Sequence, residues 1–376
     1  MNQLAKPIPG VVLAGVLGSV AYVLGQEASS HTDLISDVVI AILLGMVVLN
    51  APTGRILGIV EENGRPTSWS PGLQFTDKKL LRLAIVLMGL KVQADLFEAE
   101  KLVLVLGILA VGLPTAFLLV QSASRRLGLT GGMSDLLSIG TMVCGASAIN
   151  ALSPVIDADK RDRGIAISAV FLFSIAALLT FSPLASLVGL SAEYSGLWAG
   201  LSVNDLSSSV AVGSQFGDDA EILAAASKSI RILLLGPILV FFSMRSGRKE
   251  STGSWWNHLP LFILGYLVFF GIRTAGDAAF SEDPAWAEFL AINAKVVKWL
   301  ILAVCAGIGL QIRIQTLIAV GWKAALAGGA GSLGLAGISL AVLWSFEQHG
   351  SAVSALIGAG SCGLVWLLCR PSKSTQ

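Results

Sequence analysis

The sequence predicts an all-α polytopic membrane protein, and three observations lead to that prediction. Hydrophobic residues make up 54% of the 376 positions and charged residues only 13%, about half of the charged share of a soluble domain. Apolar segments of membrane-spanning length recur along the whole chain. Two stretches between them, 138–155 and 197–214, are instead rich in Gly, Ser and Asn. We therefore expect spanning helices together with two broken or re-entrant segments.

Sliding-window hydropathy predicts about ten spanning helices. The first segment, after Lys6, resembles a signal peptide but lacks a clear small-x-small cleavage site, so we expect a retained helix. The longest connection, 51–77, contains several Pro and Gly residues and is expected to be loop or interfacial structure. No soluble domain is predicted, and residues 1–376 are expected to form a single integral membrane unit. The ten segments are 8–25, 35–51, 78–94, 102–122, 164–189, 221–243, 257–274, 291–312, 318–344 and 350–369.

Charge placement favours re-entry of the two polar stretches. If each stretch enters and leaves on the same side, most basic loop residues lie inside, in agreement with the positive-inside rule. If both stretches cross fully, the run DADKRDR at 157–163 lies outside instead. Both arrangements place the two termini in the cytoplasm.

An internal repeat is predicted at a separation of 220 residues, because one register places Gly45 on Gly265 and Gly89 on Gly309. An odd number of spans separates the two copies, so they have opposite topology. Inverted repeats that meet at discontinuous helices are typical of secondary transporters. A weaker correspondence at a separation of 60 residues pairs the two polar stretches. The expected repeats cover about 8–160 and 221–370, with the stretches 138–155 and 197–214 between their outer parts.

The polar stretches are the candidate solute site. Glycines such as Gly145 permit unwinding, which frees backbone N–H groups and helix ends that suit small anions. Neutral hydroxyl and amide groups can replace a hydration shell. A plainer interpretation is that small residues only let helices pack closely. The neutral candidates are Thr141, Ser147, Asn150, Asn204, Ser207, Ser208 and Ser209.

Three basic residues and one acid complete the candidate site. Asp205 is the acid clearly inside a polar stretch, and it is the natural coupling residue for Na⁺ or H⁺. Lys228 and Arg231 are three residues apart, so they share a helix face in the next span. Arg82 has a similar place in the third segment, and arginine can grip an oxyanion with two parallel hydrogen bonds. Snorkelling of these bases to the membrane surface is the alternative.

No enzymatic chemistry is predicted. The three histidines lie at segment edges, and no phosphate-binding or dinucleotide-binding motif is present. The four cysteines have no metal-like spacing, and we expect reduced thiols. A formal net charge of +1 does not suggest nucleic acid as a partner. We expect no cofactor apart from a coupling Na⁺ or H⁺, and the expected partners are a small anion and the lipid bilayer.

Several runs resemble the YeiH-type sulfate exporter family, and together they cover most of the chain in the right order. These runs are KKLLRLAIVLMGLKV (78–92), GTMVCGASAINALSPVIDA (140–158), SVNDLSSSVAVG (202–213) and SKSIRILLLGP (227–237). The resemblance implies a carrier of the bacterial inner membrane that exports sulfate or sulfite. It further implies likeness to the cation–proton antiporter and bile-acid symporter superfamily, with a core of crossing broken helices, a scaffold domain, elevator-type movement and a homodimer.

By matching position, the resemblance implicates a set of functional residues. Family members often have a histidine where this chain has Asn204, so the chain lacks a group that titrates near neutral pH at this place. The implicated residues are Arg82, Cys144, Gly145, Ser147, Asp205, Lys228 and Arg231.

The function predicted from the sequence is secondary-active transport of a small inorganic anion, with sulfate or sulfite as the first expectation. One alternative is a Na⁺- or H⁺-coupled carrier of bicarbonate or of a small organic or zwitterionic solute. An alternative of another class is a channel or a membrane scaffold that transports nothing.

Overall fold

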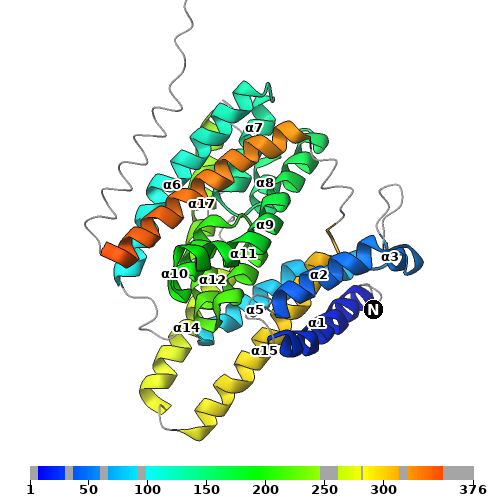
Figure 1. Cartoon of the computed structure of the whole chain (residues 1–376), viewed down its shortest axis with the longest axis vertical. Helices are drawn as coiled ribbons and strands as arrows, with labels where there is room; N and C mark the ends of the chain where they lie inside the picture. Colours follow the sequence, from blue (N-terminus) through cyan, green and yellow to red (C-terminus); the bar gives the residue numbers. More distant parts are fainter. Residues whose placement is uncertain are drawn as a thin grey trace, which may run out of the picture. The chain divides into compact units, whose positions relative to one another are not determined.

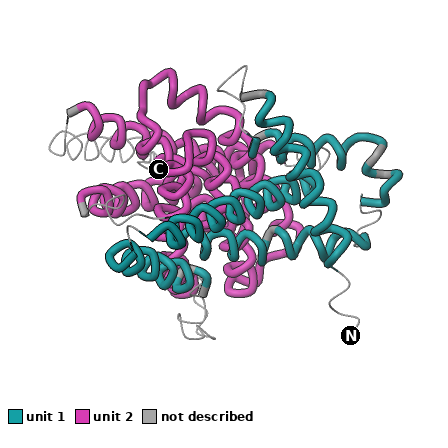
Figure 2. The backbone as a smooth tube through the Cα atoms, turned by 90° about the horizontal axis from the view of Figure 1, so that it is seen from below, with its two compact units in different colours: residues 1–98, 260–318 teal, residues 99–259, 319–376 magenta. Residues whose placement is uncertain are grey.

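A computed structural model describes residues 7–29, 37–59, 67–91, 99–245, 261–280, 283–312 and 321–349, and the regular structure within them is helical (Figure 1). The predicted segment 350–369 lies outside the described residues. The chain divides into two compact units, each assembled from two separate stretches of sequence (Figure 2). Unit 1 comprises Met1–Glu98 and Pro260–Ile318, and unit 2 comprises Ala99–Leu259 and Ala319–Gln376.

Six helical segments among the described residues are long and apolar enough to cross a membrane, so the chain is a polytopic α-helical membrane protein, as predicted. Nine of the ten predicted segments coincide with helices of the described part, but not all of them have the length of a full span. The apolar part of the second segment, for example, is only Ile40–Asn50. The six segments are Ile8–Glu27, Glu100–Arg126, Arg161–Val188, Asp218–Arg245, Pro284–Gly309 and Trp322–Gln348.

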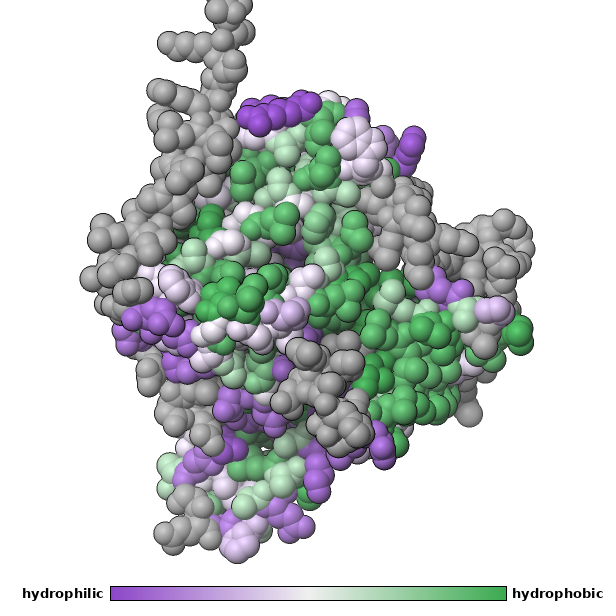
Figure 3. Space-filling model, viewed as in Figure 1, coloured by the Kyte–Doolittle hydropathy of each residue, from purple (hydrophilic) through white to green (hydrophobic). Residues whose placement is uncertain are grey.

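Unit 1 contains the N-terminal helices and the pair α14 and α15. The predicted loop 51–77 is partly helical, because it contains α3, α4 and the beginning of the π-helical turn η1. Apolar side chains cover the exposed surface over α1, including Val12, Val16 and Val20 (Figure 3). The elements are α1 (Ile8–Ser29), α2 (Asp37–Asn50), α3 (Pro52–Ile56), α4 (Ser70–Phe75), η1 (Thr76–Leu80), α5 (Leu81–Met88), η2 (Gly89–Lys91), α14 (Leu261–Phe280) and α15 (Pro284–Gly309).

Glycines allow two close backbone contacts in unit 1. A Cβ atom on Gly45 of α2 would collide with the backbone of α15 next to Gly309, and a Cβ on Gly309 would collide with the backbone of α2. Gly89 lies in the same way against the backbone of α14 at Tyr266. Larger residues at these positions would force the helices apart.

Unit 2 contains two helical hairpins, and the first is α7–α8. Its entry residue Thr130 donates a hydrogen bond through Oγ1 to Asp162 Oδ2 in the first turn of α9, at 3.2 Å. The stretch between them therefore returns to the end of the unit from which it started. The elements of unit 2 are α6 (Ala99–Arg126), α7 (Gly131–Met142), α8 (Ala146–Leu152), α9 (Lys160–Val188), α10 (Ala192–Ser202), α11 (Leu206–Gly213), η3 (Ser214–Phe216), α12 (Asp218–Leu233), α13 (Leu235–Arg245) and α17 (Trp322–His349).

The second hairpin is α10–α11. Gly196, near the start of α10, lies directly against the backbone of Ala220 in the first turn of α12. Gly213, at the end of α11, also lies close to Ala220. The start of α10, the end of α11 and the start of α12 are thus together, so this stretch also returns to its own end of the unit.

The two hairpins enter from opposite ends of unit 2. Lys101 at the start of α6 forms an ion pair with Glu193 in the first turn of α10. Gln121 of the same helix donates a hydrogen bond to Asp135 near the start of α7, at 2.8 Å. The 20 residues from Lys101 to Gln121 correspond to about 30 Å of helix. The helices α7 and α10 therefore start far apart and run toward each other.

Candidate site at the crossing of two helix breaks

Each hairpin contains a break in its helix, and the two breaks are 60 residues apart. α7 ends at Met142 and α10 at Ser202, while α8 begins at Ala146 and α11 at Leu206. The weaker of the two predicted repeats therefore has the same register as the breaks. In the first break, Gly145 has φ +63° and ψ −127°, a backbone conformation that residues with a Cβ rarely adopt.

The breaks lie against each other. A Cβ atom on Gly145 would be 3.4 Å from Asp205 Cβ and 3.7 Å from the carbonyl oxygen of Asn204. The absence of a side chain at Gly145 thus gives space for the second break. We call the residues of the two breaks, together with Lys228 and Arg231, the crossing.

Arg231 of α12 joins the two breaks. Its side chain is fully buried, and Nε donates to the carbonyl of Met142 at 2.6 Å while Nη2 donates to that of Thr141. Nη1 donates to the carbonyls of Leu201 and Val203 at 2.9 and 3.0 Å. These carbonyls are at the C-terminal ends of α7 and α10, which lack partners within the helices and carry partial negative charge. The guanidinium therefore compensates both helix ends at once.

Lys228 lies one turn before Arg231 and is also fully buried. Its Nζ donates to the carbonyl of Val203 at 2.6 Å. Cys144 and Asp205 are within electrostatic range of this ammonium group. The predicted placement of Lys228 and Arg231 on one helix face thus brings both cations to the crossing.

Asp205 begins α11 and is 8% exposed. Its Oδ2 accepts hydrogen bonds from the backbone N–H of Ser208 at 2.8 Å and from the hydroxyl of Ser207 at 2.9 Å. This is the standard N-cap arrangement for a helix. Its Oδ1 is buried and has no hydrogen-bond partner in the described part of the chain. A buried acceptor without a donor is costly, so this oxygen points to a missing proton, ion or ligand.

Several other predicted residues use their polar groups within unit 2. Asn204 is 1% exposed and donates to the carbonyl of Val170 and to the Ser332 hydroxyl. The Thr141 hydroxyl donates to a carbonyl of its own helix, and the Ser209 hydroxyl donates to the carbonyl of Ala199 in α10. In this conformation these three side chains stabilise the crossing.

The remaining predicted residues have different surroundings. Cys144 and Ser208 are buried at the breaks, whereas Ser147 and Asn150 of α8 are exposed. Arg82 is in unit 1, where it is exposed and lies over the ring of Phe262 at 5.9 Å. Within unit 2 the structure therefore assembles all the predicted charged residues except Arg82.

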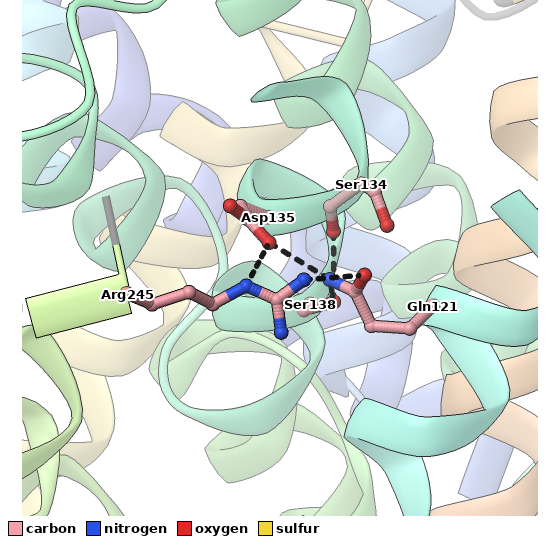
Figure 4. A network of polar contacts seen from close by, with 5 residues as sticks. All are labelled: Gln121, Ser134, Asp135, Ser138 and Arg245. Carbon is pink, nitrogen blue, oxygen red and sulfur yellow. Dashed lines mark hydrogen bonds and ion pairs between the residues drawn. The ribbon is translucent and has the colours of Figure 1, made fainter. Parts of the chain in front are cut away.

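Sequence reasoning missed a polar network at the entry of the first hairpin (Figure 4). Gln121 of α6 donates to Asp135 Oδ1 and to the Ser138 hydroxyl, at 2.8 and 3.3 Å, and accepts from Arg245 at 3.1 Å. The Arg245 guanidinium is also 3.8 Å from Asp135. An acid among apolar residues of a short helix was the signal that pointed to Asp135. The partners on α6 and α13 are far away in sequence.

The family of the chain follows from comparison with known proteins. The family model described as conserved hypothetical protein 698 matches residues 9–328. The chain is 31% identical over 327 residues to a UPF0324 membrane protein of Corynebacterium glutamicum, covering 85% of this chain and 87% of the relative. It is 32% identical over 315 residues to a UPF0324 membrane protein of Clostridium tetani, covering 79% and 88%. No solved structure matches. The chain belongs to the conserved hypothetical protein 698 family, whose relatives are UPF0324 membrane proteins.

Proposed function

We propose that the protein is a secondary-active transporter of a small inorganic anion, with sulfate or sulfite as the first substrates to test. The observation that carries this proposal is the crossing, where two fully buried cations and one carboxylate lie where two helix breaks meet. Ionisable groups buried in a membrane protein are costly and usually mark a solute or ion pathway.

The arrangement of the hairpins supports alternating access. Discontinuous helices that enter from opposite ends and meet in the middle form the central sites of many secondary transporters. The contacts in unit 1 fit the predicted inverted repeat. The repeat equates Gly45 with Gly265 and Gly89 with Gly309. Gly45 contacts α15 at Gly309, and Gly89 contacts α14 next to Gly265, as a two-fold relation requires. In this proposal unit 2 is the mobile core of an elevator and unit 1 is the scaffold.

A second candidate is a Na⁺- or H⁺-coupled carrier of bicarbonate or of a small organic or zwitterionic solute. The free Oδ1 atom of Asp205 favours it, because a proton or a cation bound there would satisfy this oxygen. The same role for Asp205 is compatible with anion transport in which the ion gradient drives uptake.

Uptake into proteoliposomes tests the proposal. Labelled sulfate, sulfite and bicarbonate are offered under Na⁺, H⁺ and counter-anion gradients. We expect uptake of at least one anion by the natural chain, and a loss of at least tenfold for Arg231→Met. The Lys323→Gln variant, an exposed lysine of α17, serves as the control and should retain uptake. Absence of anion uptake under every gradient would refute the function, and dependence on a cation gradient that is lost in Asp205→Asn would support coupling.

A further inference from the structure

The charge and the free acceptor of the crossing together define what it can bind. We propose that the solute is a monovalent oxyanion that keeps one acidic proton, such as hydrogen sulfite or hydrogen carbonate, and that Asp205 Oδ1 accepts a hydrogen bond from this proton. This inference rests on the proposed anion transport and names the substrate class of that site.

The charge balance favours a monovalent anion. The charged side chains of the crossing are Lys228, Arg231 and Asp205, which give two positive charges and one negative charge. One bound monovalent anion neutralises the remainder. A divalent anion such as sulfate would leave one uncompensated negative charge among side chains that are at least nine-tenths buried, where uncompensated charge is most unfavourable.

The hydrogen-bonding groups favour an anion that carries a proton. Asp205 Oδ2 already has two donors, whereas Oδ1 has none. A fully deprotonated oxyanion offers only acceptors and would leave Oδ1 unsatisfied beside another negative oxygen. An anion with an O–H group supplies the missing donor. Sites built around such a hydrogen bond strongly reject analogues that lack the group.

Lys228 can bind the other oxygens of such an anion. In the described residues its Nζ forms a single hydrogen bond, to the carbonyl of Val203, so two of its three N–H groups stay available. Arg231 is different, since four of its five N–H groups already bind the carbonyls of the two breaks. We therefore assign anion contact to Lys228 and a positioning role to Arg231.

Nitrate and hydrogen carbonate form a matched pair for the test, because both are planar monovalent anions with three oxygens and only hydrogen carbonate has a proton. Binding of these two anions, of hydrogen sulfite and of sulfate to the purified full chain is measured by titration calorimetry at one pH. We expect the two protonated anions to bind at least tenfold more tightly than nitrate and sulfate. Nitrate binding equal to hydrogen carbonate would overturn the hydrogen-bond argument, and tightest binding of sulfate would overturn the charge argument.

The Asp205→Asn substitution tests the acceptor directly. Asn can present an N–H group in place of Oδ1, so the preference for protonated anions should fall at least tenfold while nitrate and sulfate gain. Thr180→Ala, at an exposed hydroxyl of α9, is the control and should keep the preference. If Asp205→Asn does not fold, the four anions on the natural chain still decide the question. Lack of binding and of transport for every anion would instead refute the proposed function itself.

Discussion

The Arg231→Met substitution leaves the two helix breaks without the guanidinium that joins them. Met is also long and unbranched, so it fills much of the same space. The change is therefore mainly a loss of hydrogen bonds, since the carbonyls of Thr141, Met142, Leu201 and Val203 all lose a donor. Their positions at helix ends prevent them from finding partners in their own helices.

The expected magnitude follows from these four contacts. A hydrogen bond to a charged group contributes about 1.5–3 kcal/mol, which for four bonds would be large. The burial of the guanidinium costs several kcal/mol in return, and removal of one partner from a buried charged contact typically destabilises by about 3–5 kcal/mol. We expect a loss of this size for Arg231→Met. Arg231→Lys keeps the charge but cannot reach both breaks, so we expect a loss of roughly 2 kcal/mol.

Unfolding in mixed micelles with increasing SDS measures these differences in the free energy of unfolding. The control is Lys323→Gln, where an exposed side chain changes and the effect should be within about 0.5 kcal/mol. An Arg231→Met variant as stable as the control would refute the conclusion that the guanidinium holds the crossing together.

Three more predictions follow from unit 2. Gly145→Ala should lower the free energy of unfolding by about 1–3 kcal/mol, because φ is +63° and the new Cβ would be 3.2 Å from Val170; an unchanged unfolding curve would contradict the strained backbone. In a double-mutant cycle, Asp135→Asn and Arg245→Gln should couple by less than about 1 kcal/mol, because the Arg245 side chain is 44% exposed, and additive effects would show that the two do not interact. Cysteines at Asp157 and Asp218 should react with impermeant reagents from opposite sides of the membrane, because they follow hairpins that enter from opposite ends; labelling from one side would exclude this topology.

Local composition alone determined the membrane character and the position of the unusual segments. Long apolar runs require a membrane or a core, and polar residues at the same depth require protein around them. The stretches 138–155 and 197–214 therefore contain both helix breaks. The three-residue spacing of Lys228 and Arg231 likewise indicated a shared face, because helical geometry is local.

The contacts of these groups depended on the tertiary structure. Arg231 was predicted to grip an anion, yet most of its N–H groups bind carbonyls of two helices that are 89 and 30 residues away in the sequence. The Gln121 and Arg245 partners of Asp135 are equally distant. Sequence periodicity shows which face of a helix a residue occupies. Which backbone or side chain meets that face is decided only when separate helices pack, and at the crossing this packing left Asp205 Oδ1 without a donor.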